Sequence, residues 1–140
     1  MIILDTNVVS ELMREAPAQA VLKWVEQQKQ TELALTSIAI AEIQRGILRL
    51  AKGKRRNKLE RNFRGFAETA FSGRVFAFDE DAAYIYGDIA TEREKAGFNT
   101  DAIDLMIAAI AKSHNAAIAT RNVKDFKDCG INIINPWTNK

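Results

Sequence analysis

Short apolar runs recur along the chain, and polar residues directly follow most of them. Residues 2–4 are Ile-Ile-Leu and precede Asp5, Thr6 and Asn7. A continuous apolar run without alternation is typical of a strand that is buried on both faces of a sheet. The pattern predicts strands at residues 2–4, 32–35, 75–78, 116–119 and 131–134.

Between these runs, apolar residues recur at the spacing of helices. We expect helices at 8–13, from Pro17 onward, from 37 to about 50, at about 56–70, at 79–96, and from Thr100 or Asp101 to about 115. Thr36 or Ser37 can cap the third of these helices, and Gly97 can end the fifth. The apolar stripe of the third helix consists of Ile40, Ile43, Ile47 and Leu50.

Strands that alternate with helices predict a mainly parallel sheet, because right-handed crossovers place helices on both of its faces. We therefore expect a three-layer α/β fold with about five strands. The 140 residues, 47% of them hydrophobic, suffice for one domain with a sizeable core.

Positive charge is concentrated in one segment, although the net charge is only +2. Residues 45–64 contain nine lysines and arginines and one glutamate, so they carry +8 and the rest of the chain −6. Such segregation suits a polyanion, because neutralised phosphates release counterions. A solvated helix face with a basic turn is the alternative interpretation. The residues expected to contact a polyanion such as RNA are Arg45, Arg49, Lys54, Arg55 and Arg56.

The cysteine content and the N-terminus bear on location. Cys129 is the single cysteine, so no internal disulfide is possible and a reducing compartment is expected. The N-terminus lacks the basic lead and long apolar stretch of a signal peptide, and no run approaches the roughly 20 apolar residues of a membrane span. We expect a cytoplasmic protein with no membrane partner.

Three carboxylates stand in settings that are unfavourable for charge. Asp5 follows a strand, Glu42 lies in a helix of isoleucines, and Asp104 interrupts an apolar run at 103–107. Buried carboxylates are costly unless they are paired or bound to a cation. Ligands collect beyond the carboxyl ends of parallel strands, so we expect the three carboxylates to meet at that edge of the sheet.

Some acidic positions also have structural explanations. Glu42 could pair with Arg45 at i,i+3, which is worth roughly 0.2–0.5 kcal/mol on a helix surface. Asp101 could stabilise the first turn of its helix through the helix dipole. Asp104 lies deeper in the apolar segment, so the functional interpretation favours Asp104 over Asp101.

A second polar cluster follows the predicted strand at 116–119, as Thr6 follows the first strand. Thr120 could orient a carboxylate or a phosphate through its hydroxyl, and Asn122 or Asp125 could add an oxygen ligand. Turn chemistry is the alternative, because Asn and Asp favour loops by bonding to their own backbone.

Oxygen ligands of this kind suit Mg²⁺ or Mn²⁺. Such an ion can turn a water into an attacking hydroxide, and a second ion about 3.5–4 Å away can stabilise the leaving oxygen. Histidine and cysteine catalysis are disfavoured, because His114 lies near a predicted helix end and Cys129 has no histidine nearby in the sequence.

Four motifs together resemble those of the PIN-domain ribonucleases. They are Ile-Leu-Asp-Thr-Asn at 3–7, Ala-Glu-Ile at 41–43, Asp-Leu-Met-Ile-Ala-Ala at 104–109 and Ala-Thr-Arg-Asn at 119–122. The chain is more closely similar to the VapC-type toxins of type II toxin–antitoxin pairs, including the FitB-like branch with its closing Asn-Pro-Trp at 135–137. The likeness covers nearly the whole chain.

This resemblance implies a Mg²⁺- or Mn²⁺-dependent endoribonuclease in which Asp5, Glu42 and Asp104 surround the metal and Thr6 supports it. It also implies a homodimer and a VapB-like antitoxin whose C-terminal part blocks the site, with DNA bound only through the antitoxin. Many members have a fourth acid after the Thr-Arg pair, where this chain has Asn122, with Asp125 three residues later. A one-metal site therefore stays open beside a two-metal site.

The resulting hypothesis is that Asp5 and Asp104 hold the ion, that Glu42 positions or deprotonates the attacking water, and that the basic segment guides RNA in. A phosphatase of the haloacid dehalogenase kind also opens with a strand that ends in Asp, but it needs a second Asp where this chain has Asn7. A non-catalytic module that binds nucleic acid or protein through residues 45–64 is the other rival.

Overall fold

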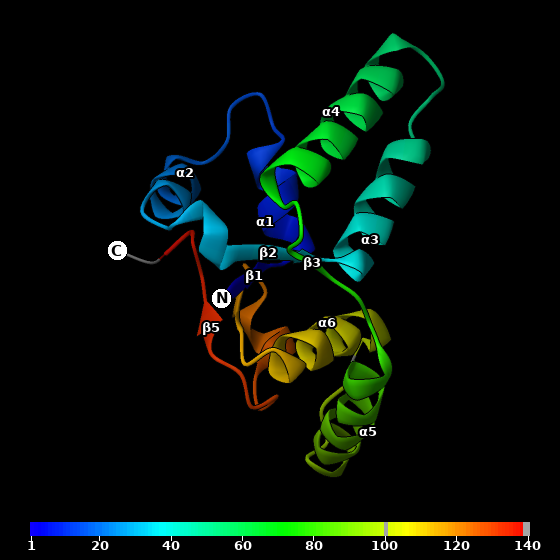
Figure 1. Ribbon diagram of the computed structural model, residues 1–140. Coiled ribbons are helices and arrows are strands. Elements are labelled where there is room, and N and C mark those ends of the chain that lie inside the picture. The colour runs from blue at the N-terminus through cyan, green and yellow to red at the C-terminus, as the bar shows by residue number, and fades with distance from the viewer. Residues whose placement is uncertain (100, 139–140) are drawn as a thin grey trace.

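The computed structural model describes residues 1–99 and 101–138, which form one parallel sheet of five strands (Figure 1). The strands are β1 (Ile2–Leu4), β2 (Leu33–Thr36), β3 (Val75–Phe76), β4 (Ala117–Ala119) and β5 (Ile133–Ile134). Their order is β3-β2-β1-β4-β5, so β1 is central, with Ile3 opposite Ala34 on one side and Ile118 on the other. The predicted α/β fold is confirmed.

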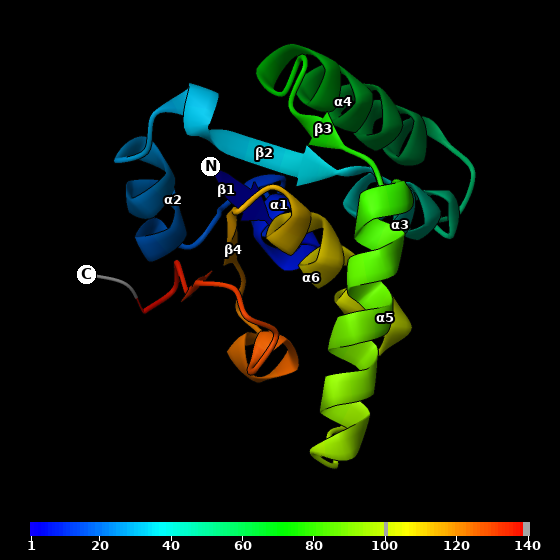
Figure 2. The same cartoon turned by 60° about the horizontal axis from the view of Figure 1, so that its bottom comes forward.

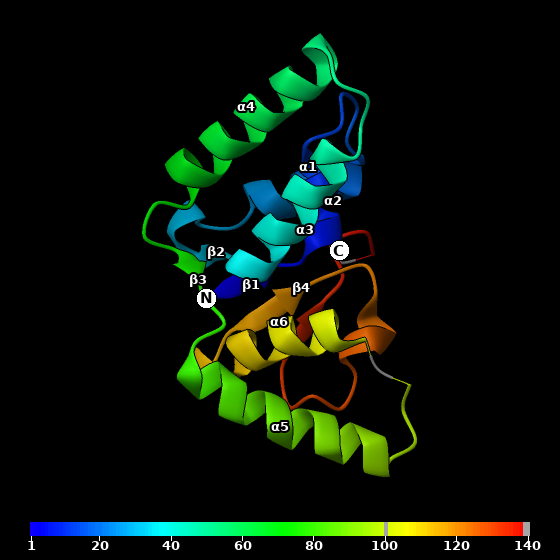
Figure 3. The same ribbon diagram turned by 90° about the vertical axis from the view of Figure 1, so that its right-hand side faces the viewer.

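Helices cover both faces of the sheet (Figure 3). On one side lie α1 (Thr6–Leu12), α2 (Gln19–Glu26), α3 (Ser37–Leu48) and α4 (Lys54–Ala70), and on the other α5 (Glu80–Lys95) and α6 (Ala102–Ser113). Two short 3-10 turns, η1 (Gln30–Glu32) and η2 (Val123–Phe126), complete the chain. Ile3 and Leu4 are both buried but belong to different cores, because successive side chains of a strand point to opposite faces.

The strands lead almost directly into helices at one edge of the sheet. Asp5 is both the residue after β1 and the N-cap of α1, and Thr36 ends β2 and caps α3 by accepting a hydrogen bond from Ala39 N at 3.0 Å. In Figure 2 the arrows of β2 and β3 point the same way, toward the beginnings of α3 and α5. Polar capping residues therefore gather at the carboxyl ends of the strands, as parallel topology requires.

The helices α3 and α4 form a hairpin that extends away from the sheet (Figure 1). Its inner side is apolar, and Phe63 is buried against the core that contains Leu4. Among the predicted RNA-binding residues, Arg56 is half-buried and the other four are exposed. Leu50 does not continue the predicted apolar stripe, because α3 ends at Leu48, and it is 37% exposed.

Several element boundaries differ from the predicted ones. The second helix begins at Gln19 rather than at Pro17, because its N-cap Ala18 has a non-helical ψ of 130°. The Ala18 N–H donates to the Glu11 carboxylate at 3.0 Å instead of lying within a helix. The basic helix begins at Lys54, and β3 and β5 are shorter than expected. Asp101 precedes α6, whereas Thr100 lies outside the described residues. No helix in the described ranges is long and apolar enough to cross a membrane.

Candidate active site

Asp5 lies at the centre of the polar edge and is 4% exposed. Its backbone N–H donates to Ala119 O at 2.9 Å, which continues the pairing of β1 with β4 by one residue. Its Oδ1 accepts from Thr6 N at 2.9 Å and so caps α1. One carboxylate oxygen is therefore committed to the start of the helix, while the other faces its neighbours in the site.

The second oxygen of Asp5 is held by side chains from two strand ends. Thr120 Oγ1 donates to Asp5 Oδ2 at 2.8 Å, and Asn7 Nδ2 donates to the same oxygen at 3.2 Å. Thr120 is fully buried and its hydroxyl also accepts from Asn122 N at 3.0 Å. The predicted role of Thr120 in orienting a carboxylate is therefore consistent with its contacts, although Thr120 does not itself line the pocket described below.

Glu42 reaches the same edge from α3. Thr6 Oγ1 donates to Glu42 Oε1 at 2.6 Å, within the 2.5–2.7 Å range of a charge-assisted O–H···O⁻ bond. The alternative pairing with Arg45 does not form, since the one ion pair in the described part of the chain joins Arg14 to Glu11 at 3.2 Å.

Asp104 enters from the other side of the sheet, in the first turn of α6. The turn is capped by Asp101, which accepts from Ile103 N at 2.8 Å. Asp101 is exposed and lies at the N-cap, one position before the first turn where it was expected, so it supports the helix start through this hydrogen bond. Asp104 is half-buried and faces the site.

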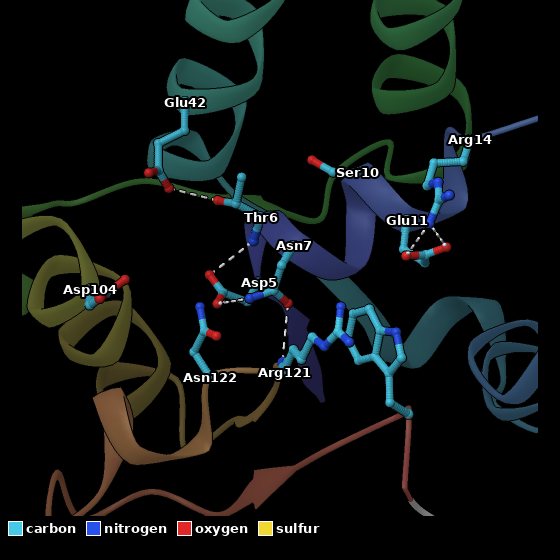
Figure 4. A pocket seen from close by; sticks show the side chains of 11 residues that line it. Asp5, Thr6, Asn7, Ser10, Glu11, Arg14, Glu42, Asp104, Arg121 and Asn122 are labelled. Carbon is cyan, nitrogen blue, oxygen red and sulfur yellow. Dashed lines mark hydrogen bonds and ion pairs between the residues drawn. The ribbon is translucent and has the colours of Figure 1, made fainter. Parts of the chain in front are cut away.

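These side chains form the wall of one open pocket of about 490 Å³ (Figure 4). The residues that line it are Asp5, Thr6, Asn7, Ser10, Glu11, Arg14, Glu42, Asp104, Arg121, Asn122 and Trp137. The three predicted carboxylates and Thr6, Asn7 and Asn122 are thus brought together from four regions of the chain. Asp125 and the predicted RNA-binding residues 45, 49 and 54–56 do not line this pocket.

The electrostatics of the pocket favour protons or cations. Burial raises the pKa of Asp104 to about 7, and the negative charge of Asp5 adds to this effect. Burial also raises the pKa of Asp5, against which the hydrogen bonds from Thr120 and Thr6 act. Asp125 contributes from outside the pocket, because its charge raises the pKa of both carboxyls.

Oxygen donors dominate the carboxylate end of the pocket, which is the ligand type that Mg²⁺ and Mn²⁺ prefer. In residues 1–99 and 101–138, however, no three carboxylate, histidine or cysteine side chains lie close enough to hold one ion directly. Mg²⁺ usually keeps several waters and binds through one or two carboxylates, so the donor set fits such an ion without a complete protein cage.

Five residues of the wall were missing from the predicted site: Ser10, Glu11, Arg14, Arg121 and Trp137. Glu11 and Arg14 are three positions apart, the spacing of an ordinary helix surface pair. Arg121 stands between two residues that were predicted, and Trp137 lies in the closing Asn-Pro-Trp motif. The spacing and the motif were therefore visible in the sequence, but neither indicated a position in this pocket.

Comparisons with known proteins agree with this architecture. The sequence matches the PIN domain family over residues 2–131. It is 39% identical over 137 residues to the VapC ribonuclease Y4jK of Sinorhizobium fredii, with 98% of each chain covered. It is 36% identical over 137 residues to the toxin FitB of Neisseria gonorrhoeae, with 98% of this chain and 99% of FitB covered.

Solved structures give the same result. The crystal structure of FitAcB from Neisseria gonorrhoeae matches with a TM-score of 0.94 and 35% identity, covering 99% of this chain and 100% of that one. Similar folds also occur in structures of VapBC toxin–antitoxin systems from other bacteria. The resemblance predicted from the four motifs is confirmed, and this chain belongs to the PIN domain family.

Proposed function

We propose that this protein is a metal-dependent endoribonuclease and the toxin of a toxin–antitoxin pair. The observation that carries the proposal is the convergence of Asp5, Glu42 and Asp104 on one pocket at the carboxyl ends of the strands. The names of the VapC ribonuclease and FitB toxin relatives support the activity and its setting.

The carboxylate cluster supports a bound Mg²⁺ or Mn²⁺. Asp5 and Asp104 would hold the ion, directly or through water, since burial and mutual repulsion already make their ionised forms costly. When bound, the ion would lower the pKa of a nearby water, so that loss of a proton supplies hydroxide as the nucleophile, and it would offset charge on the phosphodiester. Asn122 lines the pocket and could add an oxygen ligand, while Asp125 would act through its charge.

The remaining residues have roles that follow from their contacts. Glu42 would orient the attacking water and accept its proton, with its own position fixed by the Thr6 hydroxyl. Thr120 and Asn7 would keep the Asp5 carboxylate in place through Oδ2. Asp101 would act indirectly, by capping the turn that carries Asp104.

The basic hairpin is proposed to guide the substrate toward the pocket. Arg45 and Arg49 lie on α3, the same helix as Glu42, and Lys54, Arg55 and Arg56 follow at the start of α4. Electrostatic attraction between such a surface and phosphates raises the rate of association. The proposal includes a cytoplasmic homodimer and a VapB-like antitoxin that occludes the pocket, with DNA bound only through the antitoxin.

The direct test is cleavage of a mixed-sequence RNA by purified Asp5→Asn and Asp104→Asn in Mn²⁺. Both should cut at least about 100-fold more slowly than the wild type, because a charge that the transition state requires is lost. Asp88→Asn, on the exposed part of α5, is the matched control and should cut at the wild-type rate. Wild-type rates in both site variants would contradict the proposal.

EDTA separates the proposed function from its rivals. Chelator-sensitive cleavage supports the nuclease, whereas RNA retention without cleavage supports a binding module. Hydrolysis of small phosphate esters would support a phosphatase. The side chain of Asn7 argues against the phosphatase, because its amide is engaged with Asp5 and with the backbone N–H of Arg121 and has no acidic proton to donate.

A further inference from the structure

The pocket has two chemically different ends. Glu42 and Asp104 lie at one end, and Glu11 and Arg14 lie at the other, with Asp5, Asn7 and Arg121 between them (Figure 4). The proposed chemistry uses the carboxylate end and Asp5, and it gives no role to Arg14 or Arg121. Two arginines in the wall of a nuclease-like pocket therefore need an explanation of their own.

Arg121 is tied to the proposed metal site through one side chain. Asn7 Nδ2 donates to Asp5 Oδ2 at 3.2 Å, and Asn7 Oδ1 accepts from the backbone N–H of Arg121 at 3.1 Å. The amide of Asn7 makes both contacts at once, because its NH₂ group donates and its oxygen accepts. The position of Arg121 is thus linked to that of Asp5.

The guanidinium of Arg121 is placed by an aromatic ring. It lies over the indole of Trp137, 5.1 Å from the ring centroid, which is within the range of a cation–π contact. Trp137 is half-buried and packs against the core on the α1 side of the sheet. Its backbone is fixed by a hydrogen bond from Trp137 N to Asn135 Oδ1 at 2.9 Å. The closing Asn-Pro-Trp motif therefore supports a cation in the pocket.

Arg14 is anchored by a nearly buried acid. Glu11 is 7% exposed and accepts from Arg14 Nη1 at 3.2 Å, while the Ala18 N–H donates to Glu11 Oε2 at 3.0 Å. The hydrogen bond from Ala18 lowers the pKa of Glu11 and so favours the carboxylate form that pairs with Arg14. The Arg14 side chain is still 66% exposed, which leaves its guanidinium accessible from the pocket.

We propose that Arg121 and Arg14 form a phosphate subsite, which holds a phosphodiester adjoining the one that is cleaved. Trp137 and Glu11 are the positioning residues of this subsite. The guanidinium group can bind two phosphate oxygens at once, so an arginine suits an RNA backbone better than a lysine does. The inference rests on the proposed ribonuclease function, and it assigns the register of the RNA chain relative to Asp5.

An acidic peptide is the competing occupant, because carboxylates also bind arginine forks. The phosphate is favoured by the link through Asn7, because the subsite adjoins the proposed cleavage site and consecutive phosphates of one bound strand would then lie near both ends of the pocket. An acidic peptide would bind the arginines alone, because the carboxylate end of the pocket would repel its other acidic side chains.

The test is steady-state cleavage of a single-stranded oligoribonucleotide by Arg121→Gln, Arg121→Lys, Arg14→Gln and Trp137→Leu. Arg121→Gln should raise KM about tenfold or more and leave kcat within about threefold, as expected when binding is lost equally in the ground and transition states. Arg121→Lys should have a KM between those of the wild type and Arg121→Gln. Trp137→Leu should also raise KM, by less than Arg121→Gln does. Lys95→Gln, at the end of α5, removes one positive charge elsewhere and should leave KM unchanged.

A binding arm separates this inference from the proposed function. Fluorescence anisotropy with the oligoribonucleotide in EDTA, which removes the ion that the proposed cleavage requires, should show about tenfold weaker binding to Arg121→Gln and a salt slope shallower by about 0.7. If the wild type cuts no RNA but binds the oligonucleotide in an Arg121-dependent way, the subsite stands and the proposed function falls. If Arg121→Gln had the same KM and the same affinity for the oligonucleotide as Lys95→Gln, the subsite would be overturned. Binding of hexaglutamate that depends on Arg121, with RNA binding unaffected, would also overturn it.

Discussion

The Thr6 hydroxyl donates to Glu42 at 2.6 Å and joins the first turn of α1 to α3 across 36 positions of the chain. The neighbouring N–H of Thr6 donates to Asp5 at 2.9 Å. One residue therefore contacts two of the three predicted carboxylates, through its backbone and its side chain. This arrangement fixes the carboxylates relative to each other before any ligand binds.

Replacement of Thr6 by Val should lower the RNA cleavage rate strongly and the free energy of unfolding only moderately. The variant keeps the shape and the backbone N–H, so α1 stays capped, but Glu42 loses a charge-assisted hydrogen bond worth about 1.5–3 kcal/mol. We expect kcat to fall roughly tenfold or more, and Thr6→Ser to restore most of it. Thr6→Val in a Glu42→Gln background should add little, because the two changes remove the same interaction. Full additivity would contradict the coupling.

Thr120→Val should destabilise the fold even though the volume is conserved. The substitution removes one of the two side-chain donors to Asp5 Oδ2 and the acceptor of Asn122 N, while Asn7 still donates to Asp5 Oδ2. A hydrogen bond to a charged group is worth about 1.5–3 kcal/mol, and an ordinary one about 0.5–1.5 kcal/mol. Urea unfolding should show a loss of about 2–4 kcal/mol, whereas Thr120→Ser, which retains the hydroxyl, should lose about 1 kcal/mol. An equal loss in both variants would assign the effect to packing.

Mn²⁺ should stabilise the wild type and have little effect on Asp104→Asn. A ligand that binds only the folded state at 100 times its Kd stabilises that state by about 2.7 kcal/mol. In thermal melts, increasing Mn²⁺ should therefore raise the Tm of the wild type and of the Asp88→Asn control by several degrees. The same response in Asp104→Asn would show that the ion binds elsewhere.

The raised pKa of Asp104 predicts a pH-dependent stability in EDTA. The carboxyl titrates at about 7 in the fold against 3.8 ordinarily, so between these values the folded chain binds more protons than the unfolded chain. Stability that is present below the lower value is then lost as the pH rises toward 7. Asp5 acts in the same direction. The Tm of Asp104→Asn should exceed that of the wild type by a margin that widens from pH 5 to pH 8. Each kcal/mol of difference in unfolding free energy corresponds to about 4 °C in Tm. A constant difference would contradict the shift.

The sequence predicted the carboxylate end of the pocket because that end depends on strand order. Asp5 and Thr120 follow apolar runs, and the carboxyl ends of adjacent parallel strands necessarily lie side by side. The partner of Glu42 was harder to predict. Arg45 is closer in sequence, but Thr6 is nearer in space because α1 packs against α3.

The arginine end could not be predicted in the same way. Arg14 and Glu11 look like any surface pair on a short helix, and their place in the wall depends on the turn that returns Ala18 to Glu11. Trp137 follows the last strand, and its approach to Arg121 depends on the path of the chain after β5. Such contacts are set by tertiary packing rather than by periodicity. The boundary of α2 differed for the same reason.

The two carboxylate oxygens of Asp5 make different contacts: Oδ1 caps the first turn of α1, and Oδ2 accepts from Thr120 and Asn7. Under the proposed function, replacing Asp5 would remove a metal ligand and the N-cap of α1 together, whereas replacing Asp104 would leave that cap intact. If the proposed function holds, Asp104→Asn is therefore the better choice than Asp5→Ala for producing an inactive but correctly folded protein in cells.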